Sequence, residues 1–244
     1  MKKYILIILV VFAVGTAKAQ SGYGYKPFGV GFGVSYATAY TNVASASGRP
    51  SVDASLVYSF IPYFPVAVEF QAGQFAGGGL TSNLDPFLRK YTNNYKAVLI
   101  HEDLHMGAYL DYSSDKLLRI VKNFYGGTGF GFIFNSVTNQ RTSLLPGNAG
   151  YVFPGSDKTT NFLVPIRVGY EFKIYSFYNA PNVTIDIGYT HNLVFNGQLD
   201  GYNDNFSGHT TTLQQYSQFN VGIKAFFGPT KLYNKLIRSY DRSE

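Results

Sequence analysis

One segment of the sequence carries residues spaced as in a metal-dependent hydrolase. His101-Glu102-Asp103-Leu104-His105 matches the pattern H-E-x-x-H, in which two histidines bind zinc and the glutamate acts as a general base. This chemistry requires a helix, because residues four apart then lie side by side. On a β-strand, His101 and His105 would stand about 13 Å apart along the chain. One zinc ion cannot bind both at that separation.

The residues around this motif favour the strand. Apolar side chains occupy every second position from Val98 to Leu110, except at Glu102. This period of two is typical of a strand with one apolar face. We therefore predict no catalytic residue, no metal ligand and no cofactor here, and a zinc metalloprotease is only the alternative interpretation.

Other polar and charged residues recur opposite apolar positions in the same way. With the two histidines they form a predicted inward-facing set: Asp53, Glu69, His101, Asp103, His105, Arg167, Glu171, Lys173, Asp186 and Lys224.

The segment 28–40 sets the pattern for the elements that must position this set. Its even positions are large and mostly apolar, from Phe28 to Tyr40, and its odd positions are Gly, Ser or Ala. Side chains alternate between the two faces of a strand. One face is therefore apolar, and the other is small enough to line a crowded interior. An apolar face that does not meet a protein core is typical of a strand in lipid.

Seven further segments alternate in the same way. We predict strands over 28–40, 51–60, 65–76, 95–112, 124–135, 162–174, 183–195 and 213–227. Each is long enough to cross a bilayer as a tilted strand, and the last one can pair with the first to remove the open edges. The connections 77–94, 136–161 and 196–212 are long, and a short amphipathic helix is predicted within 113–123. The predicted fold is an all-β, eight-stranded antiparallel up-and-down transmembrane barrel.

The composition agrees with export to an outer membrane. Residues 1–19 have a basic start, a short apolar run and the end Ala17-Lys18-Ala19, the parts of a cleavable signal peptide. Charged residues make up 14% of the chain, against about 25% in soluble domains. Cleavage lowers the formal net charge from +6 to +3, which gives no reason to expect nucleic acid binding. The absence of cysteine excludes disulfides and a thiol nucleophile.

The pattern over Phe28–Phe227 resembles the small eight-stranded outer-membrane barrels of the OmpA and OmpX type. Phe227 occupies the place of the aromatic residue that ends the last strand in that family. The resemblance implies a porin-like or OmpA-like protein of the Gram-negative envelope. The residues after Phe227 are too few for the cell-wall-binding domain of some members, so that activity is not carried over.

The barrel is expected over residues 20–228 and a periplasmic amphipathic helix over 229–244. Gly228-Pro229 ends the last strand, and Thr230 is a plausible helix cap. Apolar residues then recur at helical spacing, next to Lys and Arg. This predicted membrane-interface helix contains Leu232, Tyr233, Leu236, Ile237 and Tyr240. It would rest on lipid or bind a periplasmic or other envelope protein.

The inward polar set admits two interpretations. Charges inside a narrow barrel must pair or be hydrated, and small barrels are usually filled by side chains. We expect a salt-bridged filling and a non-enzymatic outer-membrane protein, structural or surface-interacting, in contact with lipid. The alternatives are a small passive pore, an accessory subunit of an export or transport assembly, and a lipid-modifying barrel enzyme.

Overall fold

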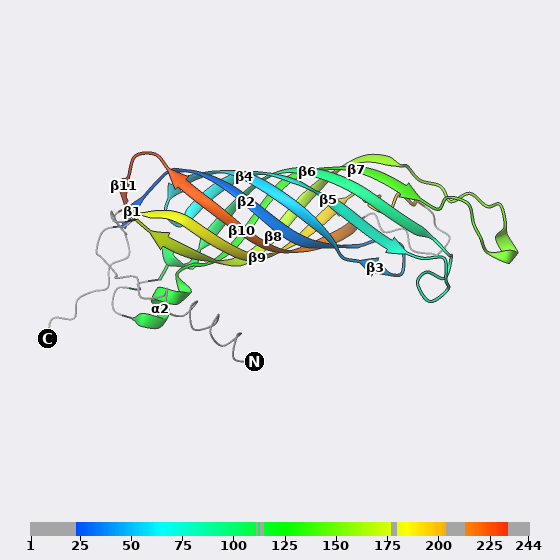
Figure 1. The fold of residues 1–244 in the computed structure, drawn as a ribbon, viewed down its shortest axis with the longest axis horizontal. Helices are drawn as coiled ribbons and strands as arrows, with labels where there is room; N and C mark the ends of the chain where they lie inside the picture. The colour runs from blue at the N-terminus through cyan, green and yellow to red at the C-terminus, as the bar shows by residue number, and fades with distance from the viewer. Residues whose placement is uncertain (1–22, 111, 113–114, 177–179, 204–212, 234–244) are drawn as a thin grey trace.

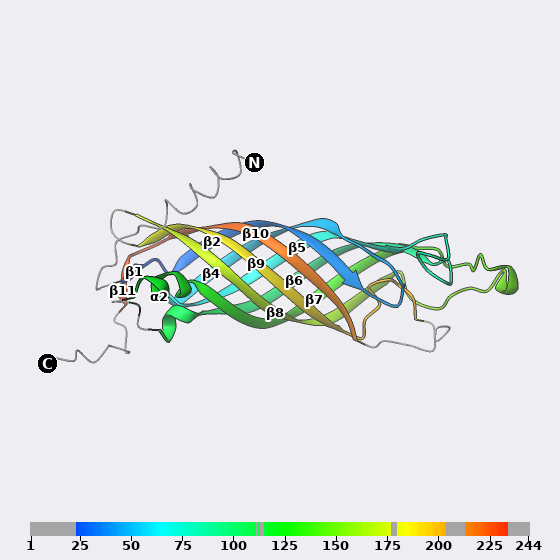
Figure 2. The same cartoon turned by 90° about the horizontal axis from the view of Figure 1, so that it is seen from below.

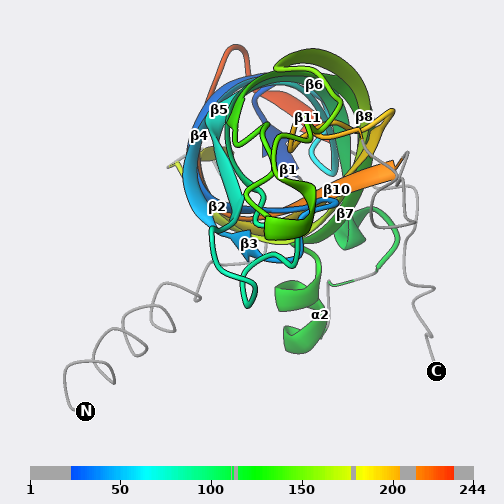
Figure 3. The ribbon, with the colours of Figure 1, turned by 90° about the vertical axis from the view of Figure 1, so that its right-hand side faces the viewer.

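Eight long antiparallel strands close into a barrel, as predicted. The structure is a computed structural model that describes residues 23–110, 112, 115–176, 180–203 and 213–233. Neighbouring strands pair in the order β5-β4-β2-β10-β9-β8-β7-β6, and β5 also pairs with β6, which closes the sheet (Figures 1 and 3). The strands are β2 Phe28–Tyr40, β4 Arg49–Ile61, β5 Phe64–Gly78, β6 Lys90–His105, β7 Phe124–Asn139, β8 Lys158–Tyr175, β9 Pro181–Phe195 and β10 Leu213–Phe227.

Short elements lie at the two ends of the barrel. One end carries the two-stranded sheet of β1 and β11 together with helix α2, and the long loops leave the other end (Figure 2). We call these the β1/β11 end and the long-loop end. None of the helices described is long and apolar enough to span a membrane. The short elements are β1 Tyr23–Tyr25, β3 Ala46–Ser47, the 3₁₀ helices η1 Met106–Ala108 and η2 Pro146–Asn148, α2 Lys116–Val121 and β11 Lys231–Tyr233.

The alternation of large and small residues decides which face of each strand points outward. On β2, the side chains of Phe32 and Tyr36 are 62% and 59% exposed, whereas Ala37, which points to the opposite face, is buried. The same alternation continues on the other strands and gives the barrel an apolar outer belt, the surface required in a bilayer. The inward positions are small where neighbours need the space. A Cβ atom at Gly33 would lie 2.6 Å from both carboxylate oxygens of Asp53.

The interior is filled at two levels of different chemistry. The half near the long-loop end contains the apolar cluster, in which Phe75, Tyr95 and Tyr216 are buried. Leu199 and Tyr202, from the loop after β9, belong to the same cluster. The half near the β1/β11 end contains the buried charged residues of the strands, such as Arg167 and Glu171. The barrel is therefore a packed domain whose core lies inside the sheet.

Several predicted boundaries differ from the observed ones. The strand predicted over 95–112 runs from Lys90 to His105, so Tyr109 lies beyond its end and is 61% exposed. Polar residues such as Asn93 made the start of β6 look like a loop. The Asn93 side chain, however, faces inward and forms a hydrogen bond inside the barrel. The loops predicted over 77–94 and 136–161 shrink to 79–89 and 140–157, whereas the loop 196–212 has the predicted bounds. Part of the last loop, 204–212, lies outside the described residues.

The predicted helices are also corrected in part. Helix α2 is capped by Asp115, whose carboxylate accepts a hydrogen bond from the Leu117 N–H. Of the helix expected over 229–244, Lys231–Tyr233 instead form strand β11, which pairs with β1. Pairing with Tyr23–Tyr25 satisfies the backbone of β11, a contact that the helical spacing of its side chains does not reveal. Leu236, Ile237 and Tyr240 lie outside the described residues.

Candidate functional site

The inward polar set forms a buried network, and Arg167 on β8 lies at the centre of its first part. The Arg167 Nε is 3.0 Å from Asp103 Oδ1, and Nη1 is 3.3 Å from Glu69 Oε2. His101 lies between the same two carboxylates, with Nε2 3.1 Å from Glu69 and Nδ1 3.5 Å from Asp103. All four side chains are buried. Strands β5, β6 and β8 are thus joined through the lumen.

The second part of the network surrounds Glu171 and Lys224. The Lys224 Nζ lies 2.8 Å from Glu171 and 2.7 Å from Asp186. His105 Nε2 is 2.9 Å from the other oxygen of Glu171. Lys173 Nζ is 3.4 Å from Glu171 and donates to the Pro62 carbonyl oxygen. Glu171 and Asp186 therefore each have a basic partner, which offsets the cost of removing the carboxylate charge from water.

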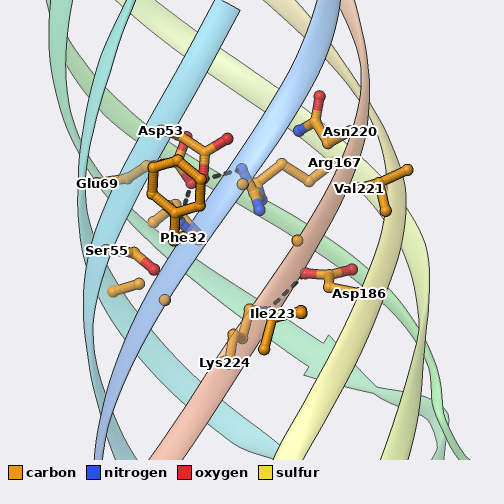
Figure 4. A pocket seen from close by; sticks show the side chains of 15 residues that line it. Phe32, Asp53, Ser55, Glu69, Arg167, Asp186, Asn220, Val221, Ile223 and Lys224 are labelled. Carbon is orange, nitrogen blue, oxygen red and sulfur yellow. Dashed lines mark hydrogen bonds and ion pairs between the residues drawn. The ribbon is translucent and has the colours of Figure 1, made fainter.

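Asp53 lines a cavity together with several other predicted lumen residues, Glu69, His101, Arg167, Asp186 and Lys224. The cavity has a volume of about 30 Å³ and lies behind β2 and β10, next to Gly31, Gly33 and Gly222. In Figure 4 the Asp53 carboxylate points into the same space as Glu69 and Arg167. A cavity of this size holds about one or two waters. The space is too small for a substrate.

The H-E-x-x-H motif lies within strand β6. His101 and His105 are buried in the lumen and bind different carboxylates, those of Glu69 and Glu171. Glu102 is exposed on the opposite face of the strand, so it cannot act as a base for a metal held by the histidines. Among the residues described, no group of three or more acidic, histidine or cysteine side chains is placed to hold a metal ion.

An aromatic layer closes the lumen above the network. The Phe75 and Tyr95 rings stack with centroids 4.1 Å apart, and Tyr216 packs 4.9 Å from Phe75. The Tyr95 hydroxyl accepts a hydrogen bond of 3.1 Å from Gln218 Nε2. All three rings are buried.

The long-loop end is covered by a cap in which four loops interlock. Arg89 forms a buried ion pair of 3.0 Å with Asp85 and donates to the Asn42 carbonyl oxygen. The Tyr202 hydroxyl lies 3.1 Å and 2.8 Å from the carbonyl oxygens of Lys90 and Gln140. These bonds tie the loops 41–48 and 79–89 to the loop after β9 and to the end of β7.

Asp200 anchors this cap from within. Its carboxylate accepts hydrogen bonds from the N–H groups of Asn42 and Tyr202, each 3.0 Å long. Burial nevertheless raises the pKa of Asp200 above its usual value, because the ionised form is removed from water. Burial likewise raises the pKa of the Tyr202 hydroxyl. Protonation of Asp200 therefore favours the closed cap.

The loop 140–157 extends beyond this cap as a separate arm (Figure 1). Thr142 and Val152 form a β-bridge, and Arg141 pairs with Asp157 at the base. Residues 142–156 contain no charged side chain. Leu144 and Val152 are 48% and 61% exposed. The arm therefore presents an apolar surface far from the barrel.

Sequence reasoning missed several residues of these sites. The hydroxyl of Tyr125, inside the network, donates to Asp186 Oδ1 at 2.9 Å. Tyr125 lies two residues before Gly127, which faces inward, so the alternation along the strand was sufficient to predict that Tyr125 also faces inward. The Asp85–Arg89 pair and Asp200 lie in loops, where no periodic pattern indicates burial.

Comparisons with known proteins find similar solved structures among outer-membrane barrels. No family model matches the sequence, and no curated protein matches it closely. The crystal structure of Neisserial surface protein A is 14% identical, with a TM-score of 0.46, over 82% of this chain and 97% of that one. Ail of Yersinia pestis, in complex with the heparin analogue sucrose octasulfate, is 12% identical, with a TM-score of 0.43, over 83% and 99%. OprG of Pseudomonas aeruginosa is 9% identical, with a TM-score of 0.36, over 84% and 99%.

Proposed function

We propose that this chain is a non-conducting outer-membrane barrel that presents the 140–157 arm at the cell surface. The filled lumen carries this proposal. Paired charges occupy one half of the lumen, the Phe75–Tyr95–Tyr216 layer occupies the other, and the cap covers the long-loop end. Passage of a solute would require the removal of buried side chains. A passive pore is therefore disfavoured.

The arm supports a surface-interaction role over a purely structural one. A loop that only joined β7 and β8 would need few residues, whereas this one has its own hydrogen bonds. The Ser143 N–H donates to the Tyr151 carbonyl oxygen at 2.8 Å, and the Phe153 N–H to that of Arg141 at 2.9 Å. Exposed apolar side chains on an ordered projection are typical of a recognition surface.

The outer belt supports location in the outer membrane, with lipid as the surrounding partner. Strands of 13 to 18 residues exceed the roughly 9–11 that a tilted strand needs to cross a bilayer. With the 140–157 arm at the cell surface, the long-loop end is extracellular and the β1/β11 end is periplasmic. The lumen histidines support no enzymatic role, since each binds a carboxylate inside the filled barrel.

Planar bilayers test the non-conducting part of the proposal. We expect no steady ion current from the folded protein, with a known porin as the positive control.

The surface position of the arm is tested by cysteine labelling, because the chain contains no cysteine of its own. Gly147→Cys, where a side chain would meet nothing within 4 Å, should react with a membrane-impermeant maleimide on intact cells. Lys116→Cys on α2 should react only after the outer membrane is permeabilised.

Binding through the arm is tested with a triple substitution. Replacing Leu144, Tyr151 and Val152 by Ser should reduce attachment of expressing cells to an apolar polystyrene surface. Replacement of Thr159 and Thr160 by Ser, near the base of the arm, is the matched control. Steady conductance by the wild-type protein, or equal attachment by both variants, would contradict the proposal.

A further inference from the structure

The connection between β6 and β7 leaves a group of apolar side chains exposed beside the barrel. Leu117 and Ile120 on α2 are 64% and 54% exposed, and no residue of this helix is buried. Single exposed apolar residues are ordinary, but a contiguous group marks an interaction site. We call this group the α2 patch: Met106, Tyr109, Leu117, Ile120 and Phe124.

Basic side chains accompany the α2 patch. Lys116, Arg119 and Lys122 recur at a spacing of three, and Lys116 lies one helical turn from Ile120. Arg119 Nε donates to the Tyr112 carbonyl oxygen at 3.3 Å, and the Lys122 ammonium lies 4.8 Å from the Tyr112 ring centre. These contacts hold the helix in one orientation. The only acid in 115–122 is Asp115, which caps the helix.

The position of α2 decides what the patch faces. The helix lies beside the barrel wall, not across its mouth, and at the β1/β11 end (Figures 1 and 3). Phe124, which begins β7, packs with its ring centre 4.7 Å from that of Tyr170 on the outer face of β8. The patch therefore continues the apolar outer belt at its edge. In a membrane this edge lies at the head groups of the inner leaflet.

We propose that the α2 patch docks on the inner leaflet and binds anionic phospholipid. Leu117 and Ile120 insert at the boundary between head groups and acyl chains, and the Lys116 side chain faces the lipid phosphates. The charge of the segment and its continuity with the lipid-facing belt favour lipid over a periplasmic protein. The inference rests on insertion of the barrel, as proposed above, but not on the arm.

The absence of tryptophan from the chain provides a clean probe. The test is to reconstitute full-length Ile120→Trp into phosphatidylcholine vesicles with and without phosphatidylglycerol. The quenching of the tryptophan fluorescence by lipids brominated at defined depths is then measured. We expect a blue-shifted emission, quenched most by shallow bromines, and stronger quenching when phosphatidylglycerol is present. Val152→Trp on the arm is the matched exposed control and should remain unquenched. Leu117→Trp replaces Ile120→Trp if that variant does not fold.

Charge is tested by a second substitution in the same background. Lys116→Gln should reduce the ratio of docked to free helix in phosphatidylglycerol vesicles about fivefold, the effect of one basic residue near an anionic surface. High salt should have a similar effect. Emission like that of Val152→Trp in both vesicle types would overturn the inference and leave a protein as the partner of the patch. Equal quenching in both would overturn the preference for anionic lipid. Heat-modifiable gel mobility verifies insertion separately in every sample.

Discussion

Arg167 neutralises two buried acids at once, which makes it a sensitive position of the lumen. Asp103 and Glu69 lie 3.0 and 3.3 Å from its guanidinium nitrogens, and all three side chains are buried. Breaking such a pair costs more than the pair itself contributes, because an uncompensated charge stays in the interior. The network therefore fixes the register of β5, β6 and β8 relative to one another.

Arg167→Gln is expected to lower the free energy of unfolding by about 3–5 kcal/mol, since Asp103 and Glu69 lose their shared counter-charge. Urea unfolding of the barrel in vesicles measures this change. Lys158→Gln, an exposed basic residue on the same strand, is the control and should change the free energy by less than about 0.5 kcal/mol. Similar values for the two variants would show that the network is not stabilising.

Asp200 should make the stability of the cap depend on pH. Burial raises its pKa in the folded protein, so its contribution is fully present below the ordinary carboxyl pKa. That contribution is lost as the pH rises through the raised value. Hydrogen exchange in the loop 196–203 should therefore show more frequent opening as the pH rises through this window, after correction for the intrinsic exchange rate. Asp200→Asn, which cannot titrate, should remove that slope, and an unchanged slope would exclude Asp200 as its origin.

At the scale of elements, β7 shows how small residues allow strands to enclose a crowded lumen. A Cβ atom at Gly129 would collide with the Ile100 carbonyl oxygen and lie 2.6 Å from the His101 Cα. Both obstacles are backbone atoms of the neighbouring strand, so they cannot rotate away. Gly126 on the same strand faces outward and has nothing within 4 Å of the corresponding position.

Two alanine substitutions on β7 separate these roles. Gly129→Ala is expected to destabilise the barrel by about 1–3 kcal/mol, the usual cost of overpacking. Gly126→Ala should be neutral or slightly stabilising, because alanine restricts the unfolded chain more than glycine does. Urea midpoints of both variants, measured in the same vesicles, test the difference. Equal midpoints would show that the strands move apart at little cost.

For the whole molecule, closure of the sheet matters most. In hydrocarbon an unpaired strand edge leaves backbone groups without hydrogen bonds, and the pairing of β5 with β6 removes the last edge. The filled interior then makes the closed sheet rigid from within. The apolar outer belt is then the surface that faces the surroundings of the barrel, and an apolar surface of this kind requires lipid around it.

The mature protein is expected to fractionate with the outer membrane and to run as a compact band on detergent gels unless boiled. Its circular dichroism should be of the β type. These outcomes follow from a hydrogen-bonded barrel that detergent alone does not open. Recovery as a soluble periplasmic protein, or a mainly helical spectrum, would contradict the barrel. Boiling of the same sample, which should shift the band, is the internal control.

The class of fold and the face of each strand could be predicted from the residue pattern alone. The physical reason is that side chains alternate strictly along a strand, so the apolar series from Phe28 to Tyr40 and its seven counterparts specify an outer and an inner face. The same rule placed His101 and His105 on the inward face, and the structure buries both in the lumen. It also identified the charged residues that meet in the lumen.

Only the tertiary structure decided which of these charges pair, and how the two ends are built. Arg167 and Asp103 are 64 residues apart in the chain, and their contact depends on the stagger of the strands, which alternation does not encode. Asn93 and Asp200 look like ordinary loop residues until the closed barrel buries them. Lys231–Tyr233 have a helical pattern of side chains, yet β1 supplies backbone partners that make them a strand. Contacts between distant segments decided each of these features, and a single sequence records no such contact.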